Sequence, residues 1–440
     1  MTTASTGRAT MTSTGAGGTV RVEAGDADAT LHRLIREALP RARAVRHDLH
    51  RHPELAMHEH ATSQRIQAEL SAIGIPFKAG LARDTLNGQA IGGTGIVAHL
   101  PATSPEGNAL PAIGLRADID ALPILESTGK PYASATPGVM HACGHDGHTA
   151  ILLGAARVLA SMPVRPRPVT FIFQPAEEDI GGAELLCNEG ALKGGSLHDN
   201  SAGLGAPVGE VFGLHGWPQL PVGCVASRVG PLLAAVDDFE ITITGVQAHA
   251  AYPHLGRDPI VATAAVITAL QTIASRAIGP LDSVVVTVGQ VRAGSAKNII
   301  PGSAFLEGTV RTLRAATRAA ARERLHEIVT STARAHGCEA KIEYIEGYPV
   351  TENEPAATEK FFRVAEDAMG ASRVLRVEHP TMGGEDFAFY GRHAAACFFF
   401  LGLRPAGAVE CPSLHQPDFD FNDDAMPLGI EMFCRLALSR

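Results

Sequence analysis

Apolar residues in the first half of the chain follow two patterns, a helical period and short continuous runs. One face of a helix is predicted over 31–50 by the recurrence of Leu31, Leu34, Ile35, Ala38 and Leu39. A second helical pattern covers 59–73 and stops at a glycine. Apolar, β-rich runs follow at 95–100, 112–118, 169–174 and 210–215, with helical segments between the later ones. Buried strands that alternate with helices predict an α/β domain with a largely parallel sheet.

The pattern changes near Val236. A half-exposed strand at 239–245 precedes a long helix over 259–277, two strands at 283–291 and 304–312, a helix over 316–336 and a strand at 338–345. This β-α-β-β-α-β order is typical of a ferredoxin-like module. After Tyr348 the sequence returns to α/β character, with a helix over 356–369, an apolar run at 396–401 and a final helix.

These patterns predict one α/β domain that a smaller module interrupts. Residues 1–29 are rich in Thr, Ala, Gly and Ser and show no hydrophobic period, so we expect a disordered tail. The α/β domain would comprise 30–232 and 348–440, and the module 233–347. A length of 440 residues favours two domains over one core.

Charge and cysteine content narrow the class of protein. The chain has 37 Lys+Arg and 46 Asp+Glu, a net charge of −9, which argues against nucleic acid as the main partner. Seven cysteines without regular spacing argue against a disulfide framework and favour the cytoplasm. No run of eighteen apolar residues is present, so no membrane span is expected.

The stretch 141–148, HACGHDGH, packs three histidines, a thiol and a carboxylate into eight residues just before a helical pattern. Nitrogen and sulfur donors at this density are what a transition metal requires. The alternative interpretation is a polar loop with one buried cysteine. Taken alone, the stretch favours a metal loop built on Cys143 and His145.

Further polar side chains follow other strand ends, where open α/β sheets build their sites. Glu177 and Glu178 come after the strand at 169–174, His215 ends the strand at 210–215, and His415 lies near the C-terminus. Each has a plain alternative, an exposed acid or a structural histidine. Together with Cys143 and His145, the residues Glu178, His215 and His415 make five potential ligands, which suit two metals better than one. Glu177 could then take a proton from the reacting water.

Three more residues have weaker support. Asp120, which follows a strand, could orient a ligand or be a turn acid before Pro123. His249 and Asn298 lie in loops of the module, and the sequence alone favours turn residues at both positions. His249 could stabilise an oxyanion if the module closes over the metals.

Four motifs in this order resemble the di-metal amidohydrolases that include hippurate hydrolase and the indole-3-acetyl-amino-acid hydrolases, a branch of the aminoacylase and zinc-carboxypeptidase superfamily. They are RADIDALP at 116–123, HACGHDGH at 141–148, QPAEE at 174–178 and GLH at 213–215. The resemblance extends from about Arg46 to the C-terminus. It implies a mixed, mostly parallel sheet with flanking helices as catalytic domain, interrupted by a ferredoxin-like lid domain.

The resemblance also implies roles. Cys143 would bridge two divalent metal ions (Zn, Mn, Co or Ni), with ligands His145, Glu178, His215 and His415. Glu177 would be the general base, Asp120 the acid beside a ligand histidine, and Asp118 would stand where the superfamily has a histidine. His249 and Asn298 would contact the substrate, and the lid domains would form a homodimer or homotetramer. Gly216 departs from relatives with a bulkier residue, which implies a change in pocket shape.

The implied activity is hydrolysis of N-acyl amino acids, small-molecule substrates, to a carboxylic acid and a free amino acid. One alternative is a dipeptidase or carboxypeptidase of the same superfamily. Another is a metal-binding protein without turnover, which the presence of Glu177 disfavours. A third makes Cys143 a nucleophile, and this alternative predicts activity that survives chelators.

Overall fold

The computed structural model describes residues 11–15, 18–22, 24–86 and 88–439. Its contacts divide the chain into two compact units. The first unit comprises Met1–Gly230, Asn353–Glu378 and Phe389–Arg440, and the second comprises Pro231–Glu352 and His379–Ala388.

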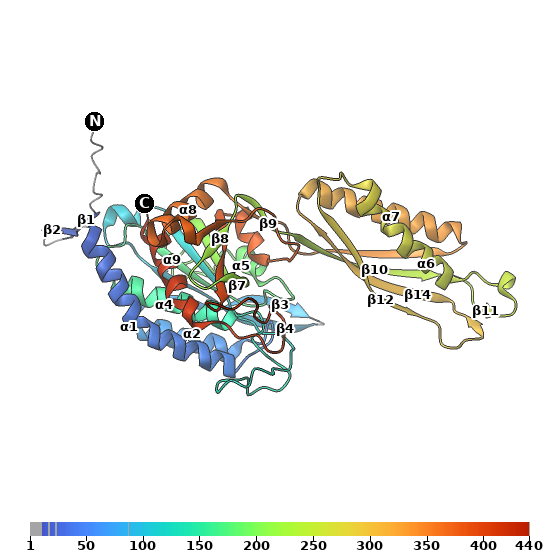
Figure 1. The fold of residues 1–440 in the computed structure, drawn as a ribbon, viewed down its shortest axis with the longest axis horizontal. Coiled ribbons are helices and arrows are strands. Elements are labelled where there is room, and N and C mark those ends of the chain that lie inside the picture. The colour runs from blue at the N-terminus through green and yellow to red at the C-terminus, as the bar shows by residue number, and fades with distance from the viewer. Residues whose placement is uncertain (1–10, 16–17, 23, 87, 440) are drawn as a thin grey trace. The chain divides into compact units, whose positions relative to one another are not determined.

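The first unit is built on an eight-stranded mixed sheet (Figure 1). Its strand order is β17-β8-β18-β7-β5-β6-β4-β3, where the strands are β3 (Phe77–Leu86), β4 (Gln89–Leu100), β5 (Ala112–Asp118), β6 (Val169–Gln174), β7 (Val208–Pro221), β8 (Val225–Ser227), β17 (Val374–Arg376) and β18 (Ala395–Arg404). The central strands β18, β7, β5 and β6 are parallel neighbours, whereas β4 and β3 pair antiparallel at one edge. The predicted mostly parallel mixed sheet is confirmed.

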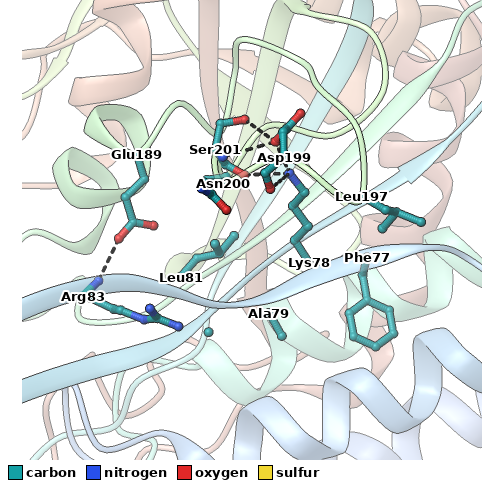
Figure 2. A pocket seen from close by; sticks show the side chains of 12 residues that line it. Phe77, Lys78, Ala79, Leu81, Arg83, Glu189, Leu197, Asp199, Asn200 and Ser201 are labelled. Atoms are coloured by element: carbon teal, nitrogen blue, oxygen red, sulfur yellow. Dashed lines mark hydrogen bonds and ion pairs between the residues drawn. The ribbon is translucent and has the colours of Figure 1, made fainter.

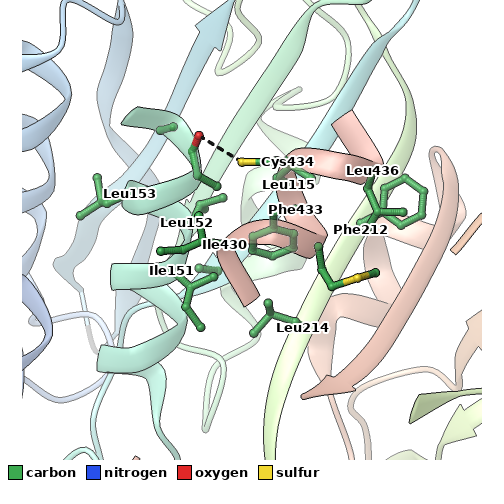
Figure 3. Packing of buried hydrophobic residues seen from close by; sticks show 14 of the residues in the cluster. Leu115, Ile151, Leu152, Leu153, Phe212, Leu214, Ile430, Phe433, Cys434 and Leu436 are labelled. Atoms are coloured by element: carbon green, nitrogen blue, oxygen red, sulfur yellow. Dashed lines mark hydrogen bonds between the residues drawn. The ribbon is translucent and has the colours of Figure 1, made fainter. Parts of the chain in front are cut away.

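Helices cover this sheet and supply the core. They are α1 (Ala24–Arg51), α2 (His60–Ala72), α3 (Pro105–Asn108), α4 (His145–Ser161), α5 (Gly182–Asn188), α8 (Pro355–Met369) and α9 (Met426–Leu438). Every residue of β5 and β6 is buried, as expected for strands covered on both faces. Figure 3 shows Ile151 and Leu152 of α4 and Phe433 of α9 packed with Leu115 of β5 and Phe212 of β7. The apolar runs that were predicted as strands therefore contribute to the core of the first unit.

Helix α1 begins at Ala24, within the segment for which composition suggested disorder, and β1 (Met11–Gly15) pairs with β2 (Gly18–Val22) ahead of it. The apolar period that marked the helix begins only at Leu31, the first residue of α1 in the core cluster, and residues 26–30 are exposed or half-buried. Residues 1–10, 16–17 and 23 lie outside the described residues.

The second unit has the order β10 (Ala235–Thr244), α6 (Pro259–Leu270), β12 (Val284–Ala293), β14 (Ser303–Thr312), α7 (Ala315–Ala335) and β15 (Glu339–Glu346). Its four-stranded sheet is antiparallel, in the order β12-β14-β10-β15. Helices α6 and α7 lie side by side on one face of this sheet (Figure 1). The alternating residues Phe239, Ile241 and Ile243 of β10 are buried against them. The predicted ferredoxin-like arrangement is confirmed.

Helix α6 and the π-helical turn η2 (Ile273–Ala277) together form one stretch, Pro259–Ala277, whose length and composition would suffice to cross a membrane. Length and composition alone are weak evidence for a membrane span, because core helices of soluble proteins pass the same test. In this chain Ala262, Val266 and Leu270 pack into the core of the second unit.

One buried asparagine joins the points where the chain leaves and re-enters the first unit. The Asn353 side chain, 1% exposed, donates to the carbonyl oxygen of Arg228 at 3.0 Å and accepts from the Phe398 N–H of β18 at 2.7 Å. It also donates to the Ser227 hydroxyl of β8 at 3.0 Å. These hydrogen bonds connect β8 and β18 at the place where the chain leaves and re-enters the first unit.

A surface pocket of about 470 Å³ lies where β3 meets the segment 197–202 (Figure 2). Lys78 extends from β3, and its Nζ lies 2.6 Å from the Asp199 carboxylate and 2.7 Å from the Ser201 carbonyl oxygen. The lysine ties this segment to the sheet edge. None of the predicted site residues lines this pocket.

Candidate metal centre and active site

The loop that carries Cys143 ends in a tight entry to α4. Gly144 is the N-cap, with a φ of 87°, a left-handed conformation that favours glycine. A Cβ on Gly147 would approach the Phe421 ring to 2.5 Å, so the first turn of the helix packs directly against that ring. The two glycines thus place Cys143 and His145 at the carboxyl edge of the sheet, where both side chains are buried.

His145 is the first residue of α4, and its ring orientation is fixed. Its Nδ1 lies 3.0 Å from the Asp120 carbonyl oxygen and 3.2 Å from the Asp120 carboxylate, so Nδ1 carries the proton and donates. Its Nε2 is buried and has no hydrogen-bond partner. The lone pair of this nitrogen is therefore available to a metal, and Asp120 orients the ring.

His215 presents a nitrogen in the same way from β7. Its Nδ1 donates to the Gly216 carbonyl oxygen at 2.8 Å, and its Nε2 lies 3.3 Å from the Cys143 Sγ. A histidine whose second nitrogen donates to a carbonyl is the usual arrangement of a metal-bound imidazole.

Glu177 and Glu178 follow β6 on one turn. The Glu178 N–H donates to the Asp120 carboxylate at 3.0 Å, while Glu178 Oε1 is buried without a hydrogen-bond partner. Glu177 is 6% exposed, and one of its carboxylate oxygens lies 3.9 Å from His145 Nε2. The adjacent acids thus face the same place as His145.

His415 comes from a distant loop and has a φ of 63°, an uncommon conformation for a residue other than glycine. Its N–H donates to the Ala142 carbonyl oxygen at 2.9 Å, which fastens its loop to the one that carries Cys143. Its Nε2 lies 3.2 Å from Glu178 Oε1, and the side chain is 51% exposed. Backbone strain beside a candidate ligand is the kind that functional sites retain.

All five predicted ligands therefore meet, in two groups that share Cys143. Donor atoms of Cys143, His145 and His215 lie within 4.8 Å of one another, and so do those of Cys143, Glu178 and His415. His145, Glu177 and Glu178 form a third overlapping group. Cys143 is thus the residue common to both candidate donor groups.

Asp118 and His148 also lie close to His145, but both are already engaged. His148 donates from Nδ1 to Asp118 at 2.7 Å and accepts the Gly216 N–H at Nε2, at 2.8 Å, so neither ring nitrogen is available. The sequence indicated only that the stretch ending at His148 lies just before a helical pattern. The hydrogen bond of His148 to Gly216, which fixes the part of β7 that carries His215, depends on the fold and has no signal in the sequence.

Gly216 lies in close packing. A Cβ there would lie 2.7 Å from Leu403 and 2.9 Å from the Phe421 ring. A larger residue would therefore press into the core, so the absence of a side chain reflects this packing.

Burial and neighbouring charges shift the pKa values of Cys143, His145 and His215. Burial raises the pKa of the Cys143 thiol well above its usual range, and Glu178 and Glu177 add to the effect. Burial disfavours charge on His145, but Asp118 and Asp120 outweigh it and raise its pKa to about 10. Burial lowers the pKa of His215 well below its usual range, and His148 contributes. The field at Cys143 and His145 favours positive charge.

His249 and Asn298 lie next to each other in the second unit. His249 belongs to β11 (Ala248–His249), which pairs with β13 (Ile299–Ile300), and Ala250 N–H donates to the Asn298 carbonyl oxygen at 3.0 Å. Both side chains are exposed. His249 Nδ1 accepts the Ala251 N–H at 3.1 Å, so the neutral ring carries its proton on Nε2.

Comparison with known proteins identifies the family. Residues 114–439 match the model of peptidase family M20/M25/M40. The chain is 39% identical over 384 residues to the N-acetyl-L-cysteine deacetylase of Bacillus subtilis, covering 87% of this chain and 84% of that protein. It is 35% identical over 398 residues to the IAA-amino acid hydrolase ILR1-like 4 of Arabidopsis thaliana, covering 89% and 84%.

A solved structure agrees. The Bacillus subtilis YXEP protein, described as a dinuclear metal binding peptidase from the M20 family, has a TM-score of 0.74 and 32% identity, covering 92% of this chain and 98% of that one. The sequence and structure comparisons therefore agree, and this chain belongs to peptidase family M20/M25/M40.

Proposed function

We propose that this hydrolase cleaves the amide bond of N-acyl amino acids, with two divalent metal ions in the centre around Cys143 and with Glu177 as general base. The observation that carries the proposal is the pair of donor groups that share Cys143. Relatives that are 35–39% identical are named for acting on an N-acetyl amino acid and on IAA-amino acids.

The residues present fit the metals. Two imidazole nitrogens, His145 Nε2 and His215 Nε2, have their partner nitrogens already donating to oxygen. His145 Nε2 is a buried polar atom without a hydrogen bond, which is costly unless something else satisfies it. Thiolate and imidazole suit zinc, cobalt or nickel, and the carboxylate also permits manganese.

When bound, two such ions would polarise the amide carbonyl and make water acidic enough to attack near neutral pH. Glu177 would accept the proton of that water and later deliver it to the leaving nitrogen. Asp120 would keep His145 in the tautomer it shows here, and it would hold the Glu178 backbone at the same time. In this scheme Glu177 alone moves a proton.

For the second unit we propose a role in substrate binding. With its Nδ1 occupied by the Ala251 N–H, His249 offers an Nε2–H that could donate to the oxyanion of the tetrahedral intermediate. Asn298 lies beside it and is exposed, which suits a contact with the substrate carboxylate.

A substrate panel tests the proposed class. Benzoyl-glycine, N-acetyl amino acids, indole-3-acetyl amino acids and simple dipeptides should be assayed in parallel on metal-analysed protein. We expect kcat/KM for at least one acyl amino acid to exceed that for every dipeptide by more than about tenfold, since one lost substrate contact changes binding by roughly that factor. Preferred turnover of dipeptides would support the dipeptidase alternative instead.

We also propose that two copies of the chain pair through β12. This strand ends the sheet of the second unit, and it exposes Val285 and Val291. The adjacent α6 exposes Ile260 and Val261. An uncovered strand edge beside apolar side chains invites pairing with another strand, and a second copy supplies one by two-fold symmetry.

Light scattering coupled to gel filtration measures this pairing. Wild type is expected at the mass of two or four chains, and Val285→Lys is expected to shift it toward one chain. The control is Leu375→Lys, on the edge strand β17 of the first unit, where the leucine is similarly exposed. A wild-type mass of one chain, or equal effects of the two variants, would contradict the proposal.

A further inference from the structure

Glu59 occupies the N-cap position of α2, but its side chain makes no capping hydrogen bond. The nearby Glu54 accepts the N–H groups of Ala61 and Thr62, at 3.1 Å and 2.8 Å. The helix is thus capped by another carboxylate, and Glu59, which is 0% exposed, is directed into the first unit.

The buried carboxyl of Glu59 has two partners. One oxygen accepts the hydroxyl of Thr94, also 0% exposed, at 2.8 Å. The other accepts the N–H of Ala176 at 2.9 Å. Thr94 thereby orients Glu59 towards the residue that immediately precedes Glu177.

Ala176 sets the direction in which Glu177 leaves the sheet. Its φ is 53°, a conformation that residues with a side chain seldom adopt without support. Its carbonyl oxygen accepts the N–H groups of Gly181 and Gly182, at 3.0 Å and 3.1 Å, which closes the turn that carries both acids. Its own N–H points the other way, to Glu59.

Two buried carboxylates therefore hold the backbone on either side of Glu177. Glu59 accepts the N–H of Ala176, and Asp120 accepts the N–H of Glu178 at 3.0 Å. Glu177 makes its turn between these two fixed points. A side chain that must meet a proton within tenths of an ångström needs such support from residues that do not react.

We propose that Glu59 is a positioning residue for the reaction, which holds Ala176 in its left-handed conformation and so aims Glu177 at the reacting water. This inference rests on the proposed role of Glu177 as general base. Glu59 touches neither metal nor substrate in this scheme and acts only through the backbone. Burial, and secondarily Asp120, raise the pKa of Glu59 to about 7, so an uncharged amide is a fair substitute for it.

The test compares three variants. Glu59→Ala removes the acceptor of the Ala176 N–H, whereas Glu59→Gln keeps an acceptor oxygen and the shape of the side chain. Glu54→Ala is the matched control, because it removes the cap of the same helix and leaves Ala176 untouched. The readouts are kcat and KM on an acyl amino acid, metal content, thermal midpoint, and amide exchange of the segment 174–182.

For Glu59→Ala we expect kcat to fall about 10- to 100-fold, KM to change less than about threefold, and metal content to stay at the wild-type level, because misplacement of a reacting group acts on the chemical step. Exchange in 174–182 is expected to accelerate. Glu59→Gln is expected to keep kcat within about threefold of wild type, since the hydrogen bond survives. Glu54→Ala is expected to lower the thermal midpoint and leave kcat unchanged.

Equal loss of kcat in Glu54→Ala and Glu59→Ala at similar thermal midpoints would overturn the proposal and assign Glu59 to general stability, as would wild-type kcat and exchange in Glu59→Ala. Should Glu59→Ala fail to fold, Thr94→Val removes only the hydroxyl that orients Glu59, and faster exchange in 174–182 is still expected. Exchange is measured without substrate. Absence of acyl-amino-acid hydrolysis in wild type with slow exchange that Glu59→Ala accelerates would therefore refute the proposed function but not the hold of Glu59 on Ala176.

Discussion

Glu177→Gln is expected to lower kcat on an acyl amino acid by about 10²- to 10⁴-fold, the range that a general base contributes, while metal content stays at the wild-type level. The amide has nearly the shape of the carboxylate but cannot accept a proton. Glu177 is buried beside His145 and Glu178, so its position is fixed even in the variant. Steady-state kinetics and elemental analysis on the same preparation check both halves of the expectation.

The matched control is Glu184→Gln, an exposed glutamate in the first turn of α5, close to Glu177 in the sequence. It is expected to leave kcat unchanged. If Glu177→Gln loses its metals together with its activity, Glu177 is a ligand and the general base must be sought elsewhere. Full activity in Glu177→Gln would remove the proposed mechanism.

Cys143→Ala is expected to abolish turnover and to empty both halves of the centre, because the Sγ belongs to both donor groups. Chelation of the wild type should have the same effect on activity and should be reversed by zinc, manganese, cobalt or nickel. Because the metals bind the folded chain, their removal should also lower the free energy of unfolding by as much as about 4 kcal/mol at a thousandfold excess over Kd.

Cys224→Ala provides the control, since this half-buried thiol lies outside every donor group of the described residues. It should retain activity and metal. The competing idea of Cys143 as nucleophile predicts the reverse pattern in wild type, with activity that resists chelators and is blocked by alkylation. Metal analysis of Cys143→Ala therefore separates the two mechanisms, because a nucleophile alone would leave metal content unchanged.

The sequence was most informative where local pattern and tertiary position coincide. The strands β5 and β6 are largely apolar, so their ends could be located, and polar residues beyond those ends were expected to meet at one edge of the sheet. Asp120 and Glu178 follow β5 and β6 in this way. His215 does not end a strand as predicted, because β7 continues to Pro221, and Cys143 and His145 lie at the entry to α4. His415 has no predicted strand directly before it, and the sequence marked it only as a histidine that could be a ligand or structural.

Other features have no local signal. Glu59 looks like an ordinary acidic residue at a helix start, and only the tertiary structure shows that Glu54 has taken over the cap. The engagement of His148 by Asp118 and Gly216 likewise depends on two strands that lie far apart in the sequence. Short strands such as β8 and β17 escape prediction because three residues carry no measurable period.

The hydrogen bonds of Asn353 also bear on how such a protein can change over evolutionary time. This side chain joins Arg228, where the chain departs, to β18, where the first unit continues, and it does so whatever the length of the intervening polypeptide. An insertion between these residues removes no strand from the eight-stranded sheet and no side chain from its core. Recombination between Arg228 and Asn353 can therefore exchange or resize the inserted segment, and with it the residues proposed to contact substrate, while the residues of the metal centre are inherited unchanged.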